Sequence, residues 1–139
     1  MELVQKTSTT RESFQVISDV FSQAITGELI GMSNFASLAE TIDDTHEKME
    51  AVEHANSERM HAEAFLAYVR KMNLNLHINM QGEYWGNVRK VFLKYAHKKD
   101  FISCLIIQEV MLESFAVSMY TDVGRALGGE AGRLFLNIA

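Results

Sequence analysis

One glutamate–histidine pair and two further glutamates lie among apolar residues at helical spacing. Glu58 and His61 stand three residues apart in the segment ANSERMHAEAF, so one helical turn places both on the same face. Glu28 in AITGELIGMSNF and Glu113 in IIQEVMLESFAVSMY have apolar neighbours about one turn away. A carboxylate in an apolar core must shift its pKa or find a partner, and a bound cation is one such partner.

These residue types suit a pair of divalent metal ions. In four-helix carboxylate centres, two helices give one glutamate each and two others give Glu-x-x-His each. The carboxylates offset the charge of the ions, and the neutral imidazoles leave coordination positions open. We therefore predict that Glu28, Glu58, His61 and Glu113 are metal ligands and form most of such a site.

The same residues also allow a simpler interpretation. A Glu-x-x-His pair arises often by chance, and a glutamate at a helix border commonly packs its stem while its carboxylate stays in water. Other polar residues on or beside these stripes are expected to orient ligands through hydrogen bonds or to compete with them, with ordinary core packing or surface exposure as the alternative. These residues are His54, Gln108, Glu109 and Tyr120.

The spacing of apolar residues predicts an all-α chain. Residues recur three and four apart in five segments, which we predict to be helices: 12–39, 46–72, 85–95, 101–120 and 121–139. The absence of proline agrees with this prediction. Gly27 and Gly31 indicate a bend or a close approach in the first helix. Segment 101–120 is the most apolar, so we expect it at the centre of a bundle.

Length and composition favour a single domain over residues 1–139. The formal net charge of −5 disfavours nucleic acid as a partner, because nucleic-acid binding needs clustered Lys and Arg. The single cysteine, Cys104, forms no internal disulfide and is expected to be a packed thiol. No apolar run reaches the roughly 18 residues of a membrane span, and the N-terminus does not read as a signal peptide. We expect a cytoplasmic protein without a membrane span.

The segment CLIIQEVMLESFAVSMY resembles the central helix of the aldehyde-deformylating oxygenases. These are ferritin-like di-iron enzymes that convert fatty aldehydes to alkanes. GELIGMSNFASLAE and ANSERMHAEAF resemble the first and second ligand helices, and the likeness covers about residues 12–139. It implies a ferritin-like four-helix bundle with additional helices, and it places Glu28, Glu58, His61 and Glu113 on ligand positions.

The resemblance also implies cofactors and partners. It implies two Fe ions, or an Fe/Mn pair, with O2 as co-substrate and an external electron donor such as a ferredoxin. We expect an apolar aliphatic substrate in a channel lined by apolar side chains, with core packing as the alternative role of each. These side chains are Phe35, Phe65, Phe115 and Val117.

The chain departs from the family pattern at three places. Phe35 stands where the family has a tyrosine near the site, and Val69 stands where it has a cysteine. These departures leave open a related di-metal oxidase acting on an amine or another small substrate, a non-catalytic ferritin-like metal-binding protein, and a metal-free interaction module. The family's second Glu-x-x-His is expected beyond Ala139, so we expect an N-terminal fragment whose last ligand helix is incomplete or missing. A degenerate paralogue that cannot bind both metals is the alternative.

Overall fold

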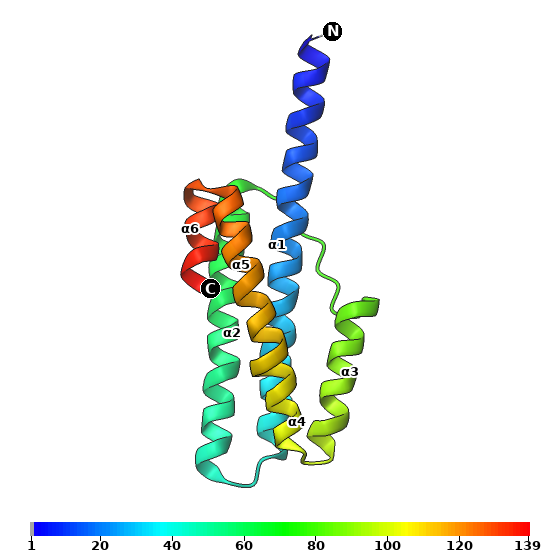
Figure 1. Cartoon of the computed structure of the whole chain (residues 1–139), viewed down its shortest axis with the longest axis vertical. Helices are drawn as coiled ribbons and strands as arrows, with labels where there is room; N and C mark the ends of the chain where they lie inside the picture. Colours follow the sequence, from blue (N-terminus) through cyan, green and yellow to red (C-terminus); the bar gives the residue numbers. More distant parts are fainter. Residues whose placement is uncertain (1) are drawn as a thin grey trace.

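Two long antiparallel helices form the frame of the fold (Figure 1). The computed structural model describes the backbone of residues 2–139 and the side chains of residues 11–139. Helix α1 (Glu2–Thr41) runs down the bundle and α2 (Thr45–Met72) returns beside it. Asp44 caps α2, because its carboxylate accepts backbone N–H bonds from the first turn at 2.8 and 3.0 Å. This hairpin sets the register in which α1 and α2 face each other.

The remaining helices pack around this hairpin. After a non-helical connection, α3 (Glu83–His97) lies along α1. Helix α4 (Phe101–Leu105), the π-helix η1 (Ile106–Leu112) and α5 (Glu113–Leu127) follow as one unbroken helical run, and α6 (Gly129–Ile138) ends the described chain. The described residues contain no strand. The prediction of an all-α, ferritin-like bundle with additional helices is confirmed.

A tight turn separates α5 from α6, within a segment that the sequence predicts as a helix loosened by its glycines. Gly128 and Gly129 have φ values of 60° and 57°, a region that favours glycine. Gly124 on α5 and Gly132 on α6 then let the two backbones meet, since a Cβ on either would collide with the other's carbonyl oxygen. Periodicity alone does not reveal this turn, because both helices keep an apolar face.

Two groups of buried apolar side chains form the core. One holds Phe21, Phe65, Tyr120 and Phe135, whose rings contact one another at centroid distances of 4.8–5.8 Å. The other lies towards the α1–α2 turn and includes Leu38, Ala51, Phe92, Ala96 and Cys104. Burial raises the pKa of the Cys104 thiol to about 11, as expected for a packed cysteine. Along α1 and α2, Glu28 and Glu58 lie between these two groups.

The central position predicted for segment 101–120 is wrong. Ile102, Val110 and Met111 are 70%, 60% and 62% exposed, because no described helix covers that side of the run. By length and mean hydropathy (1.6), Phe101–Leu127 is also apolar enough to cross a membrane, which corrects the expectation that no stretch qualifies. The core helix of a soluble protein can meet the same two criteria.

Candidate metal centre

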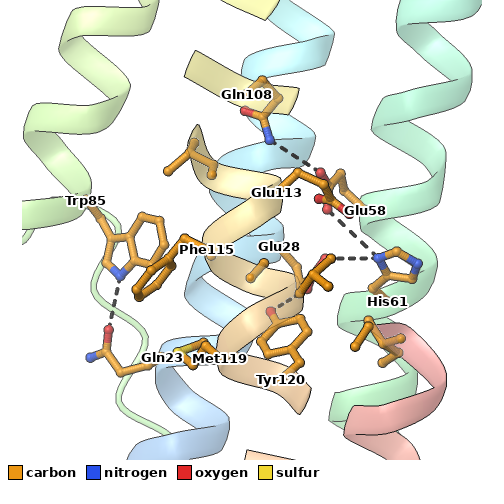
Figure 2. A pocket seen from close by; sticks show the side chains of 16 residues that line it. Gln23, Glu28, Glu58, His61, Trp85, Gln108, Glu113, Phe115, Met119 and Tyr120 are labelled. Carbon is orange, nitrogen blue, oxygen red and sulfur yellow. Dashed lines mark hydrogen bonds and ion pairs between the residues drawn. The ribbon is translucent and has the colours of Figure 1, made fainter. Parts of the chain in front are cut away.

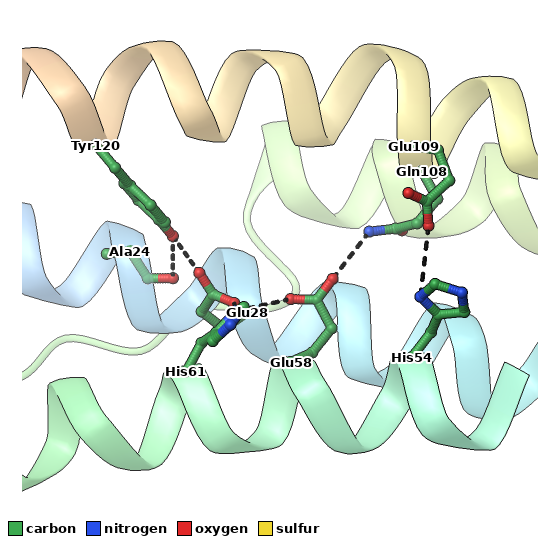
Figure 3. A network of polar contacts seen from close by, with 8 residues as sticks. All are labelled: Ala24, Glu28, His54, Glu58, His61, Gln108, Glu109 and Tyr120. Carbon is green, nitrogen blue, oxygen red and sulfur yellow. Dashed lines mark hydrogen bonds and ion pairs between the residues drawn. The ribbon is translucent and has the colours of Figure 1, made fainter. Parts of the chain in front are cut away.

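Three predicted ligands converge between α1 and α2 (Figures 2 and 3). Glu28, Glu58 and His61 each offer one ligand atom within 4.8 Å of the others. His61 Nδ1 lies 3.2 Å from Glu28 Oε2 and 4.0 Å from Glu58 Oε2. The side chains of Glu28 and Glu58 are only 5% and 13% exposed, whereas that of His61 is 38% exposed. The group is therefore buried on its carboxylate side and open at the imidazole.

The helix geometry explains this convergence. Glu58 and His61 are one turn apart on α2, so both face α1. Gly31, one turn after Glu28 on α1, lets the Glu58 carboxylate approach the backbone closely. A Cβ at Gly31 would lie 2.6 Å from Glu58 Oε1 and 3.1 Å from Gln108 Nε2. The glycine thus forms a cradle for the carboxylate that no other residue type would leave open.

The two buried carboxylates hold one proton between them. Burial, the hydrogen bond to Glu28 and the charge of Glu28 raise the pKa of Glu58 to about 10. Burial alone would also raise the pKa of Glu28, but hydrogen bonds from His61, Glu58 and Tyr120 outweigh it and place that pKa below its ordinary value. In the metal-free protein Glu58 is therefore protonated and Glu28 ionised. A metal ion would replace that proton.

Two further groups respond to the charge on Glu28. Its hydrogen bond to His61 raises the pKa of the imidazole, against the opposing effect of burial. Tyr120 donates its O–H to Glu28 Oε1 at 2.5 Å, and burial together with the charge of Glu28 raises the pKa of the phenol. Tyr120 therefore acts as a neutral hydrogen-bond donor that orients Glu28.

Glu113 reaches the same pocket from α5, but it does not join the close group of three. The residue as a whole is exposed, but its carboxyl group is partly shielded from water. This shielding and the charges of Glu109 and Glu28 raise the pKa of Glu113, and its own charge helps to raise the pKa of Glu58. Glu113 is thus close enough to act on the group electrostatically.

A π-helical turn aligns Glu113 with Gln108. The Glu113 N–H donates to the carbonyl of Gln108, five residues earlier, where an α-helix would use the residue four earlier. Residues five apart in an α-helix point about 140° away from each other. The wider turn brings both side chains to the pocket, where Gln108 Nε2 donates to Glu58 Oε1 at 3.4 Å.

The donor set fits a transition metal. Two carboxylates and an imidazole, with a third carboxylate nearby, suit Fe, Mn, Co or Zn. The model of the long-chain fatty aldehyde decarbonylase family matches residues 8–125, which include all four predicted ligands. The chain belongs to the long-chain fatty aldehyde decarbonylase family. No solved structure matches it significantly.

A small cavity adjoins the three donors in this decarbonylase-family chain. Its volume is about 40 Å³, and besides the four predicted ligands its lining includes Gln108, Phe115, Val117 and Tyr120. Figure 2 shows Trp85 and Phe115 on the side opposite His61. The Trp85 indole packs against Gly27 and donates to Gln23 Oε1 at 3.0 Å. Trp85 closes the cavity on that side.

The four residues predicted to line a channel lie in three different parts of the structure. Phe115 and Val117 line the cavity beside the donors. Phe65 is fully buried in the aromatic core and lies outside that cavity lining. Phe35 lines a different hollow near the α1–α2 turn and stacks on His54 with ring centroids 4.8 Å apart.

His54 and Glu109 form a separate pair one turn away from the donors (Figure 3). His54 Nδ1 and Glu109 Oε1 are 3.9 Å apart, and both side chains are well exposed. Neither belongs to the group of three donors. Glu109 acts on the site through its charge, which contributes to the raised pKa values of Glu58 and Glu113.

Several residues of the site are not predictable from the sequence pattern. Asn34, fully buried on α1, donates to Gln108 Oε1 at 3.0 Å. The sequence predicts Gly31 only as a point of bending or close approach, and Trp85 only as an apolar residue of a helix. A buried asparagine within an apolar helix is a usable signal, because such a side chain must find hydrogen-bond partners. Its partners lie 55 and 74 residues away, and no spacing rule reveals them.

Proposed function

We propose that this chain is an O2-activating di-metal enzyme, with Glu28, Glu58, His61 and Glu113 among the ligands of two Fe ions or of an Fe/Mn pair. The observation that carries the proposal is the convergence of Glu28, Glu58 and His61 on the Gly31 cradle, in a member of the fatty aldehyde decarbonylase family. Bound iron would supply the reduction of O2, with electrons from an external donor such as a ferredoxin.

The residues around the donors have distinct tasks in this proposal. Tyr120 and Gln108 each donate a hydrogen bond to a ligand carboxylate and hold it in place. Trp85 and Phe115 shield the cavity from bulk water, which strengthens electrostatic interactions within it. Glu58 releases its proton when a metal binds, so metal uptake and proton release are coupled.

The substrate in this proposal is an aliphatic aldehyde. The cavity of about 40 Å³ has room for O2 or an aldehyde group, but not for a long chain. An open apolar groove of about 940 Å³ lies between α3 and the η1–α5 run, and it shares Leu112 and Phe115 with the cavity. We propose that the aliphatic chain of the substrate binds in this groove. We also propose a cytoplasmic location for the protein.

The small cavity also supports a second candidate. A related di-metal oxidase acting on an amine or another small substrate would need no groove for a chain. The two candidates differ in how activity depends on substrate length. The aldehyde enzyme should favour long chains, because each buried methylene contributes about 0.8 kcal/mol to binding.

Anaerobic loading with Fe²⁺, followed by O2 and a ferredoxin reducing system, tests the proposal. We expect bound iron, and O2 consumption with alkane formation that depend on a long-chain aldehyde and are lost in Glu58→Ala. Glu53→Ala, an exposed position on the same helix, is the matched control. A protein that holds no iron would refute the proposal. Iron binding with turnover of small amines alone would favour the second candidate, and iron binding without any turnover would favour a non-catalytic metal-binding protein.

A further inference from the structure

A buried line of hydrogen bonds connects α3 to the metal ligand Glu58. Arg89 Nη1 donates to Asn34 Oδ1 at 2.9 Å, and Asn34 Nδ2 donates to Gln108 Oε1 at 3.0 Å. Gln108 Nε2 then donates to Glu58 Oε1 at 3.4 Å. Asn34 is fully buried and Gln108 is 4% exposed, so neither amide has water as an alternative partner. This line of hydrogen bonds thus joins α1, α2 and α3 to the π-helix η1.

Arg89, at the outer end of this line of hydrogen bonds, sets which way each amide side chain is oriented. A guanidinium only donates hydrogen bonds, whereas an amide side chain can turn over and exchange its donor and acceptor ends. Because Arg89 donates, Asn34 must present its oxygen to Arg89 and its N–H2 to Gln108. Gln108 must in turn present its oxygen to Asn34 and its N–H2 to Glu58. Because the Arg89 guanidinium can only donate, it fixes the N–H2 group of Gln108 against the Glu58 carboxylate.

We propose that Arg89 is a positioning residue for the metal site, acting through Asn34 and Gln108 to hold Glu58 in its ligating orientation. The inference rests on the proposed metal-binding function. Arg89 touches no ligand itself, and its second contact, from Nη2 to Ser37 Oγ at 2.9 Å, leads away from the site. Without the guanidinium, both amides can reverse, and an amide oxygen would then face the carboxylate.

The test is Co²⁺ binding, followed by calorimetry and by the visible absorption spectrum of the bound ion. In Arg89→Met we expect affinity to fall about tenfold or more, as is typical when a partner that orients a ligand is lost. Arg89→Lys should restore most of the affinity, because lysine is also a pure donor. Asn34→Asp should weaken binding and alter the spectrum, because an acceptor there turns the Gln108 amide around.

Two matched variants provide controls. Ser37→Ala removes the other hydrogen bond of Arg89 and leaves the relay intact, and Lys90→Met removes a neighbouring exposed charge. Both should bind Co²⁺ like the wild type, and thermal unfolding in EDTA reports whether each variant folds. Affinity in Arg89→Met or Asn34→Asp equal to that of the wild type would overturn the relay, as would equal weakening in Ser37→Ala. If the wild type itself binds no Co²⁺, the proposed metal site fails instead.

Discussion

Replacing Glu58 by glutamine should stabilise the metal-free protein at pH 8 while abolishing metal binding. The folded protein holds a proton on Glu58, because the pKa of this carboxyl is raised to about 10, whereas the ordinary value is 4.5. Since the folded pKa lies above the unfolded one, this contribution to stability is complete below pH 4.5. It is lost progressively as the pH rises towards 10. Glutamine is neutral at every pH, can still donate to Glu28, and removes this dependence.

The size of the effect follows from the two pKa values. Each pH unit above 4.5 costs about 1.4 kcal/mol of stability, because folding must take up a proton that the unfolded chain has released. The upper limit at pH 8 is therefore about 5 kcal/mol. Glu28 shares the proton, and water reaches the site beside the partly exposed His61, so we expect a gain of about 2 kcal/mol in Glu58→Gln. At pH 5 the gain should nearly vanish.

Urea unfolding in EDTA at pH 5, 6.5 and 8 measures this difference, with the exposed Glu53→Gln as control. The stability of Glu58→Gln relative to wild type should increase across the series, while Glu53→Gln should not diverge from wild type. With Mn²⁺ present, the melting temperature of the wild type should rise and that of Glu58→Gln should not. Parallel pH profiles for Glu58→Gln and wild type would refute the assignment of a buried, protonated Glu58.

Two further predictions concern the cradle and the third carboxylate. Gly31→Ala places a methyl group where the Glu58 carboxylate lies, so the affinity for Co²⁺ should fall roughly tenfold. The free energy of unfolding should change by less than about 1 kcal/mol, because the displaced carboxylate is at the end of a flexible side chain. Unchanged affinity by calorimetry would contradict the cradle. Glu113→Ala should lower the metal content measured by elemental analysis, whereas Glu109→Ala, one turn away, should not. Equal losses of metal in the two variants would contradict the assignment of Glu113, and not Glu109, as a ligand.

The helices were predictable because their packing repeats at helical spacing. Phe21 and Ile25 on α1, and Phe65 and Val69 on α2, are buried at the positions that periodicity indicates. Two features of the later chain were not predictable in this way. The turn at Gly128 leaves the apolar spacing intact on both sides, and the exposure of segment 101–120 depends on which elements cover it. Apolar composition alone therefore gave the wrong position for that run.

The candidate site was also predictable only in part. Residue type and local spacing were enough to pick out Glu28, Glu58 and His61, which the fold brings together, while the assignment of all four ligands stays a prediction. The π-turn that aligns Gln108 with Glu113 escaped detection, because a count of 3.6 residues per turn places these two side chains on different faces. The contacts of Arg89 and Asn34 join distant helices, and they emerge only once the helices are packed.

The most direct test of the account is the location of the metal itself. Crystals of the protein grown with Mn²⁺, measured at a wavelength where manganese scatters anomalously, would show where the ion binds. We predict anomalous density between α1 and α2, bonded to Glu58 and His61 and in contact with Glu28 and Glu113. Well-ordered side chains at these four positions without anomalous density between them would contradict the metal centre.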